Sequence, residues 1–203
     1  MLIFLEQRLA YLATPKTGTT AVESALSGRA DIVFARDRKH MPARRFQRRV
    51  APFVAETFRT RLETVAVMRD PVAQLASWYR YRTAPRLHGT DRSTAGMSFD
   101  DFVSDAISDT PPPRADVGSQ FRFLTSDTGD VLVDHLFAYE TPQAFLDFLE
   151  ARFGAPVSVD QRNVSPQAEA RLSDPVVARL REVRAADFDL HDRLIAAGGY
   201  LKR

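Results

Sequence analysis

The sequence predicts an α/β fold of three layers, with a central parallel sheet flanked by helices, in a single domain over residues 1–203. Two observations support this prediction. Short apolar runs typical of buried strands alternate with longer segments of helical periodicity, and this alternation produces parallel strands joined by helical crossovers. A chain of 203 residues with 44% hydrophobic residues can also bury a substantial core within one domain.

The expected elements follow one another in order along the chain. A hairpin at the edge of the sheet comes first, in which Leu2–Leu5 leads into Leu9–Thr14. Further strands are expected over 31–35, 64–69 and 131–139. Helices are expected over 18–27, 43–58, 71–81, 117–124, 142–153 and 174–197, the last as one or two helices. Another helix starts after Ser98, a good N-cap, and ends before three consecutive prolines at 111–113.

A loop suited to binding anions is predicted before the first helix, where residues 13–20 read Ala-Thr-Pro-Lys-Thr-Gly-Thr-Thr. Backbone N–H groups at a helix N-terminus are unpaired, and the helix dipole favours negative charge there. Gly18 lets the backbone approach an anion closely, and Lys16 supplies a positive charge. Thr19 and Thr20 add hydroxyl donors. The alternative is a threonine-rich turn that only caps the helix.

The loop differs from the P-loop of ATP-hydrolysing proteins. In that motif, G-x-x-x-x-G-K-[ST], a lysine follows the last glycine and the next hydroxyl binds magnesium. Here Lys16 precedes Gly18, and Tyr11 stands four residues before Pro15 where that motif has glycine. Hydrolysis of ATP is therefore not the expected chemistry.

A second candidate anion site follows the strand expected at 64–69, where Arg69, Asp70 and Pro71 precede a helix that carries Ser77. Ligands of open α/β sheets bind at the carboxyl ends of the strands. Arg69 can hold a phosphate through two parallel hydrogen bonds, and Ser77 can donate a third. The alternatives are a structural ion pair for Arg69 and a surface position for Ser77.

These segments resemble the sulfotransferase superfamily, in particular its small bacterial or carbohydrate-type branch. The 13–20 loop is similar to the family's 5′-phosphosulfate loop, and Arg69 with Ser77 to its 3′-phosphate signature. Between them, Lys39-His40-Met41-Pro42 resembles the segment that carries the family's catalytic base. The likeness covers the first 81 residues well and the remainder only in outline.

The resemblance implies a P-loop-like fold and a sulfotransferase activity. The donor would be 3′-phosphoadenosine 5′-phosphosulfate (PAPS), the acceptor a hydroxyl or an amine, and the nucleotide product adenosine 3′,5′-bisphosphate. The implied roles are charge neutralisation by Lys16, 5′-phosphate binding by Thr17, Gly18, Thr19 and Thr20, 3′-phosphate binding by Arg69 and Ser77, and proton abstraction by His40. Asp37 and Glu23 stay open as alternative bases, and Arg162 as a further ligand of the 3′-phosphate. No metal is required, because the transferred group carries less charge than a γ-phosphate.

Two other function classes stay open. One is a P-loop kinase-like phosphotransferase, and the other is a catalytically silent nucleotide-binding protein that uses the same loop. Hydrolase and metalloenzyme chemistry is not indicated, since the sequence has no G-x-S-x-G, no H-E-x-x-H and no Cys/His cluster. His135 is expected to be a strand residue packed near the core.

The net charge of +2 conceals a basic cluster between residues 36 and 49. Such a cluster is compatible with a solvated helix face or with an anionic partner, including an acidic acceptor. Nucleic acid is the least favoured partner, because no aromatic residues are interleaved for base stacking. We expect a small-molecule or carbohydrate acceptor, and an acceptor with a negative charge is one of the options. Its identity and the oligomeric state are not predicted.

The expected location is the cytoplasm, where PAPS is made. No apolar stretch approaches 18 residues, so no transmembrane helix is predicted. Glu6 and Arg8 interrupt the apolar N-terminus too early for a signal peptide. The chain has no cysteine, which excludes disulfides and thiol chemistry.

Overall fold

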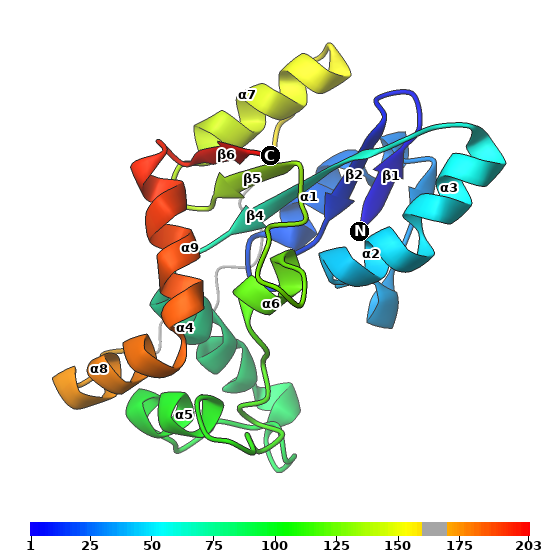
Figure 1. The fold of residues 1–203 in the computed structure, drawn as a ribbon. Helices are drawn as coiled ribbons and strands as arrows, with labels where there is room; N and C mark the ends of the chain where they lie inside the picture. The colour runs from blue at the N-terminus through cyan, green and yellow to red at the C-terminus, as the bar shows by residue number, and fades with distance from the viewer. Residues whose placement is uncertain (160–169) are drawn as a thin grey trace.

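The computed structural model describes residues 1–159 and 170–203, and within them six strands form one open sheet (Figure 1). The strand order is β3-β1-β2-β4-β5-β6. The strands are β1 (Leu2–Phe4), β2 (Leu9–Leu12), β3 (Ile32–Val33), β4 (Glu63–Met68), β5 (His135–Ala138) and β6 (Tyr200–Lys202).

The sheet is mixed, which corrects the prediction of a parallel sheet. Only the central strands β2, β4 and β5 run parallel to one another. β1 is antiparallel to β2 because a tight hairpin joins them, and β3 and β6 are antiparallel to β1 and β5. The predicted hairpin is confirmed, but it does not lie at the edge, because β3 pairs with the outer side of β1.

Helices account for most of the remaining chain: α1 (Thr19–Leu26), α2 (Ala43–Arg49), α3 (Ala51–Phe58), α4 (Pro71–Arg82), α5 (Phe99–Ala106), α6 (Gln120–Leu124), α7 (Pro142–Phe153), α8 (Asp174–Val183) and α9 (Ala185–Ala196). The helix expected over 43–58 is divided at Val50. Pro52 explains the break, because it has no N–H to donate to the carbonyl of Arg48 and its ring crowds that carbonyl. The strand expected over 131–139 begins only at His135, since Val131 instead pairs with Thr125.

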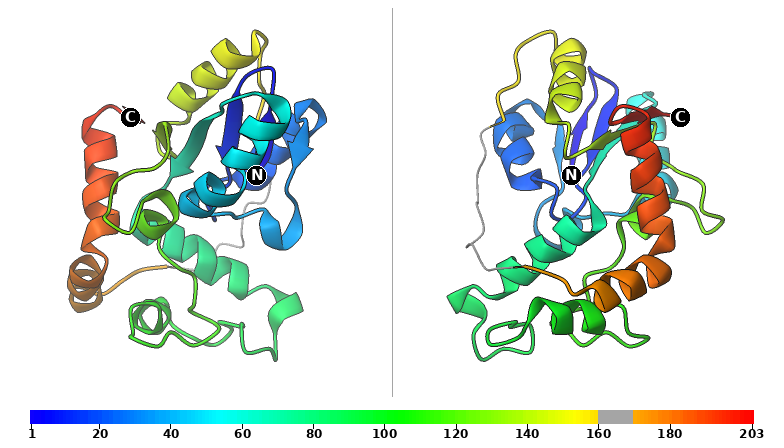
Figure 2. Two further views of the ribbon diagram at one scale, coloured as in Figure 1. Left: turned by 45° about the vertical axis from the view of Figure 1, so that its right-hand side comes forward. Right: turned by 90° about the vertical axis from the view of Figure 1, so that its left-hand side faces the viewer.

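Different helices cover the two faces of the sheet, as the views in Figures 1 and 2 show. Alternate residues of each strand point to opposite faces, so that Val65 and Val67 pack with α1 and α7 while Ala66 and Met68 pack with α2, α3, α6 and α9. Both faces are therefore apolar and buried, which is the pattern expected for a sheet between two helical layers.

A further group of helices lies beyond one end of the sheet. α4, α5 and α8 share an apolar cluster with Phe188 of α9, and Figure 2 shows them together at the end toward which β4 runs. α4 therefore starts at the carboxyl end of β4 and leads away into this helical group. No helix among the described residues has both the length and the apolar character needed to cross a membrane.

Candidate anion-binding site

The loops that carry the predicted site residues meet at one edge of the sheet. The 13–18 loop follows β2, Arg69 and Asp70 follow β4, and Tyr139 and Glu140 follow β5. Because these three strands are parallel, their carboxyl ends lie at the same edge. β3 runs in the same direction as β2, since both are antiparallel to β1, and the segment with His40 leaves from this edge as well.

The loop before α1 has the backbone geometry of an anion-binding nest. Lys16 and Gly18 both adopt positive φ angles, 66° and 74°, which turns successive N–H groups toward one side. α1 has no side-chain cap, and among the described residues the N–H groups of residues 17–20 donate no hydrogen bond. The hydroxyl of Thr17 is already engaged, because its Oγ1 donates to the carbonyl of Thr14 at 2.9 Å. The backbone N–H groups of residues 17–20 are thus available donors, together with the hydroxyls of Thr19 and Thr20, for which the structure shows no hydrogen bond to a described residue.

Tyr139 joins this loop to Arg69. A Cβ atom at Gly18 would lie 3.4 Å from Tyr139 Cε2, so the ring packs directly against the loop. The Arg69 guanidinium lies over the same ring, 4.5 Å from its centroid, and Nη1 donates to the carbonyl of Lys16 at 3.4 Å. Arg69 Nε is buried without a hydrogen-bond partner. An unpaired buried donor is costly, and an anion bound here would satisfy it.

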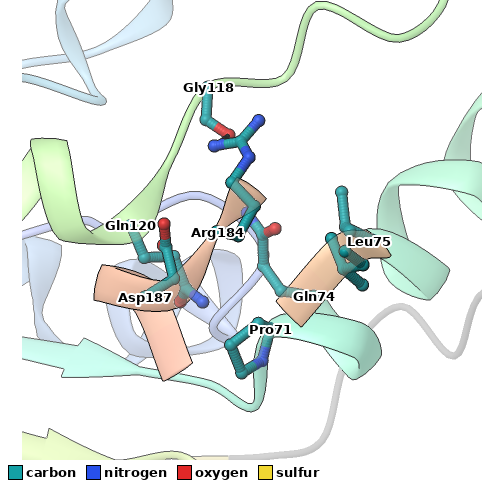
Figure 3. A pocket seen from close by; sticks show the side chains of 8 residues that line it. Pro71, Gln74, Leu75, Gly118, Gln120, Arg184 and Asp187 are labelled. Carbon is teal, nitrogen blue, oxygen red and sulfur yellow. Dashed lines mark hydrogen bonds between the residues drawn. The ribbon is translucent and has the colours of Figure 1, made fainter. Parts of the chain in front are cut away.

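The backbone of Arg69 is held by Gln120, a residue that lies in no recognisable sequence motif. The Gln120 side chain is buried, donates from Nε2 to the Arg69 carbonyl at 2.7 Å, and accepts from the Arg69 N–H at 3.0 Å. Figure 3 shows Gln120 beside Asp187 at a small pocket that Pro71, Gln74 and Arg184 also line. The Asp187 carboxylate accepts from Ser119 Oγ at 2.7 Å and thereby helps to place α6, which carries Gln120.

The turn after Arg69 is held by two carboxylates. Asp70 accepts from the Ala73 N–H at 2.7 Å and caps α4, so it does not form the ion pair with Arg69 that was an alternative. The Asp70 N–H donates to Glu140 Oε1 at 2.8 Å, and Glu140 Oε2 lies 3.3 Å from Nε2 of the buried His191 on α9. The Glu140 contact raises the pKa of His191. Burial by itself would raise the pKa of Glu140, but the hydrogen bonds that Glu140 accepts from His191 and Asp70 lower this pKa below its usual value.

The Lys16 ammonium lies against two aromatic rings of α4. Its Nζ is 3.4 Å from the ring centroid of Tyr81 and 4.3 Å from that of Trp78. Burial, together with the nearby cations Arg82 and Arg86, lowers the pKa of Lys16 to about 7. Trp78 packs partly against the apolar cluster of α4, α5 and α8 and not against the sheet, and Tyr81 is 41% exposed.

Ser77 is on α4, one turn before Tyr81 and therefore on the side of the helix that faces Lys16. It is half-buried. No hydrogen bond joins Ser77 to Arg69 or to any other residue that the structure describes. The geometry leaves the Ser77 hydroxyl available, but it does not bring Ser77 and Arg69 into contact.

His40 contacts the backbone of the anion-binding loop. Its Nδ1 lies 2.6 Å from the carbonyl oxygen of Ala13. A carbonyl can only accept, so Nδ1 carries the proton and Nε2 has the free electron pair that a base requires. Partial desolvation of the ring, aided by the charge of Lys39, lowers the pKa of His40. No arginine of the basic cluster contributes to this shift in the pKa of His40.

The alternative bases have different environments. Glu23 on α1 binds Lys39 Nζ at 2.6 Å and the N-terminal amine of Met1 at 3.1 Å. Its carboxylate is thus paired with two cations. Asp37 is exposed on a short 3₁₀ turn, with no hydrogen bond to any described residue. Of the three candidate bases, His40 has the clearest structural link to the loop of Lys16.

The basic cluster lies mostly on the exposed face of α2, opposite the buried Phe46. Arg44 forms an ion pair with Asp127, and its neighbours Arg45, Arg48 and Arg49 are exposed. Arg162, the expected further phosphate ligand, lies outside the described residues. No group of three or more His, Asp or Glu residues suited to a metal ion occurs within residues 1–159 and 170–203.

Comparison of the chain with protein-family models, with curated proteins and with solved structures gave no match. The inference of function therefore depends on the geometry of this sheet edge.

Proposed function

We propose that the protein is a cytoplasmic PAPS-dependent sulfotransferase with a P-loop-like fold. The main support is the pair of anion-binding elements that Tyr139 joins: the unpaired N–H groups of residues 17–20 and the guanidinium of Arg69. The donor has negative groups at both its 5′ and 3′ positions, and these two elements fit such a molecule. The buried, unpaired Nε of Arg69 is a donor that the 3′-phosphate would satisfy.

Each residue then has one task. The N–H groups of residues 17–20 hold the 5′-phosphate, and Arg69 holds the 3′-phosphate with help from Ser77. Lys16 places its ammonium where the leaving phosphate oxygen gains negative charge.

When bound, PAPS supplies the sulfuryl group, whose S–O bond to the 5′-phosphate breaks as a new S–O bond to the acceptor forms. The proton of the acceptor hydroxyl passes to His40 Nε2, the ring nitrogen that the contact with Ala13 leaves unprotonated.

Nucleotide preference tests this proposal. Adenosine 3′,5′-bisphosphate should raise the melting temperature more than ATP or 5′-AMP. At about 100 times its Kd, a ligand stabilises the native state by about 2.7 kcal/mol, which is a shift of roughly 5–10 °C for a domain of this size. A larger shift with ATP would favour the phosphotransferase alternative, and no shift with any of the three nucleotides would overturn nucleotide binding.

The variant Arg69→Ala tests the assignment of Arg69 to the 3′-phosphate. It should weaken binding of the bisphosphate by roughly 10–100-fold and leave 5′-AMP binding nearly unchanged, because a charge-assisted contact contributes about 1.5–3 kcal/mol. Arg29→Ala is the matched control, since Arg29 also lies over an aromatic ring, that of Phe153, but beyond the C-terminal end of α1. Equal losses for both nucleotides in Arg69→Ala would assign Arg69 to the fold instead.

A further inference from the structure

Cations and aromatic rings alternate where the Lys16 side chain meets the second half of α4 and the turn at 85–87. These residues form what we call the cation–aromatic stack, in the order Arg82, Trp78, Lys16, Tyr81 and Arg86. The Arg82 guanidinium lies 5.2 Å from the ring centroid of Trp78, and that of Arg86 lies 4.6 Å from the centroid of Tyr81. Lys16 Nζ contacts both rings, which meet edge-on with centroids 6.0 Å apart.

The three cations of the stack differ in how they are satisfied. Arg82 is buried and donates to the backbone carbonyls of Pro113 and Asp116. Lys16 is the cation assigned to the transferred group. Arg86 is exposed, and within the described part of the chain it has no hydrogen bond and no ion pair. Its planar guanidinium is therefore available to a ligand, beside the ring that Lys16 also contacts.

The stack has excess positive charge that the protein does not neutralise. None of the three cations forms an ion pair with a carboxylate of the described residues. Burial is the main cause of the lowered pKa of Lys16, and repulsion by Arg82 and Arg86 adds to it. Like charges held together in this way favour the binding of an anion, which reduces their repulsion.

The occupied rings also restrict what kind of acceptor the stack can recognise. Sugars and phenols often bind by stacking on exposed aromatic faces, but the rings of Trp78 and Tyr81 already contact cations. A neutral ring would compete with these cations for the aromatic faces. A carboxylate or a sulfate can instead bind the guanidinium of Arg86 through two parallel hydrogen bonds, with the stack left intact.

We propose that Arg86, supported by Tyr81, is an acceptor subsite for an anionic group, so that the acceptor bears a carboxylate or a sulfate besides the hydroxyl or amine that reacts. This inference rests on the proposed sulfotransferase function, because it assigns the donor to Lys16 and Arg69. The anion on Arg86 would hold the acceptor beside Lys16, whose ammonium contacts the same ring as Arg86.

Binding measurements on the protein saturated with adenosine 3′,5′-bisphosphate test this subsite without requiring turnover. Two probe pairs differ only in an anionic group: glucuronate with glucose, and 4-hydroxybenzoate with phenol. In at least one pair the anionic probe should bind 10-fold or more tightly than the neutral one. Inorganic sulfate should compete with that probe if the subsite accepts sulfate as well as carboxylate, and failure to compete restricts the subsite to carboxylates.

Variants connect the preference to Arg86. Arg86→Gln should remove most of the preference for the anionic probe in protein that still binds the bisphosphate, and Arg86→Lys should retain part of the preference. Arg181→Gln is the matched control, because Arg181 is an exposed arginine that lies 4.5 Å from the ring centroid of Phe188, on a different helix. An unchanged preference in Arg86→Gln, or no preference for either anionic probe in the wild-type protein, would overturn the proposal.

The test separates this proposal from the proposed function. If the bisphosphate does not bind, the sulfotransferase proposal fails, and the same probes are titrated into the free protein. A preference for the anionic probe that Arg86→Gln removes would still support an anion subsite at Arg86. Equal binding of charged and neutral probes would reject the subsite as well.

Discussion

Lys16 combines three properties that an ordinary surface lysine lacks: a positive φ angle, two aromatic neighbours and a pKa lowered to about 7. Its local sequence predicted a positive charge in an anion-binding loop. The aromatic neighbours were not predictable from that pattern, because Trp78 and Tyr81 lie some 60 residues away and reach Lys16 only through the fold.

The lowered pKa of Lys16 predicts that nucleotide binding takes up a proton. Above pH 7 the free amine is mostly neutral, whereas a bound phosphate favours the ammonium form and raises the pKa again. Affinity for adenosine 3′,5′-bisphosphate should therefore fall as pH rises above 7, by up to about tenfold per pH unit. Calorimetry at pH 8 in two buffers of different ionisation enthalpy measures the uptake. Lys16→Met should abolish it and Lys202→Met should not; equal uptake in both variants would contradict the assignment.

His40 should act as the general base. His40→Ala should lower turnover by roughly 10²–10⁴-fold while the affinity for the bisphosphate is retained. Since desolvation and Lys39 lower the pKa of His40, the neutral base persists below pH 6.5, and activity should fall only as pH drops through that lowered pKa. Steady-state rates against pH provide the measurement. The base is a carboxylate if His40→Ala stays active while Asp37→Ala or Glu23→Ala is inactive.

Elements with strong local signals were predicted well, and those that depend on distant partners were not. The start of α4 was predicted from Asp70 and Pro71, and α7 has the predicted bounds of 142–153. β6 was missed because it has only 3 residues and is formed through pairing with β5. The position of β3 outside β1 was also not predicted, because it depends on pairing between distant strands and the periodicity of the sequence does not indicate which strands pair.

Gln120 is the residue by which α6 positions the turn between β4 and α4. Gln120→Leu should leave the partly buried N–H and carbonyl of Arg69 unpaired, at a cost of about 1 kcal/mol each in the free energy of unfolding. The turn should also loosen, so that bisphosphate affinity falls more than 5′-AMP affinity. Urea unfolding and calorimetry measure the two effects.

A matched control is Gln47→Leu, since Gln47 also donates to a backbone carbonyl, that of Leu132, but from an exposed position on α2. Gln47→Leu should change neither the affinity for the bisphosphate nor the affinity for 5′-AMP. Gln120 would have no positioning role if its loss lowered the affinity for both nucleotides equally.

At the scale of the whole molecule, the sequence predicted the edge of the sheet that carries the candidate site but not the connections that hold it. Parallel strands with polar residues after their ends are a local pattern repeated along the chain. The contacts of Glu140 with Asp70 and His191 join positions separated by 70 and 51 residues. Such links depend on the packing of α9 beside β5, which no single segment specifies.

The contact between His191 and Glu140 should make stability depend on pH. The pKa of His191 is raised in the folded state, so its contribution is fully present below the unfolded value of about 6.5 and is lost as pH rises through the raised pKa. The pKa of Glu140 is lowered, so its contribution is present above the unfolded value of about 4.3 and is lost as pH falls through the lowered pKa. The pair should therefore stabilise the fold most between about pH 5 and 6.5.

His191→Gln should lower the free energy of unfolding by about 1.5–3 kcal/mol at pH 5.5 and by less at pH 8.5. The difference between wild type and variant is the quantity to measure, because the lowered pKa values of His40 and His135 give wild-type stability the opposite trend, rising with pH. Urea unfolding at both pH values measures this difference, and His88→Gln, at an exposed position, is the control. A loss of the same size at pH 5.5 and 8.5 would show that His191 acts through packing alone. Because His191 of α9 holds Glu140 and thereby the N–H of Asp70, the variant should also bind the bisphosphate more weakly at pH 5.5, which connects α9 to the turn that presents Arg69.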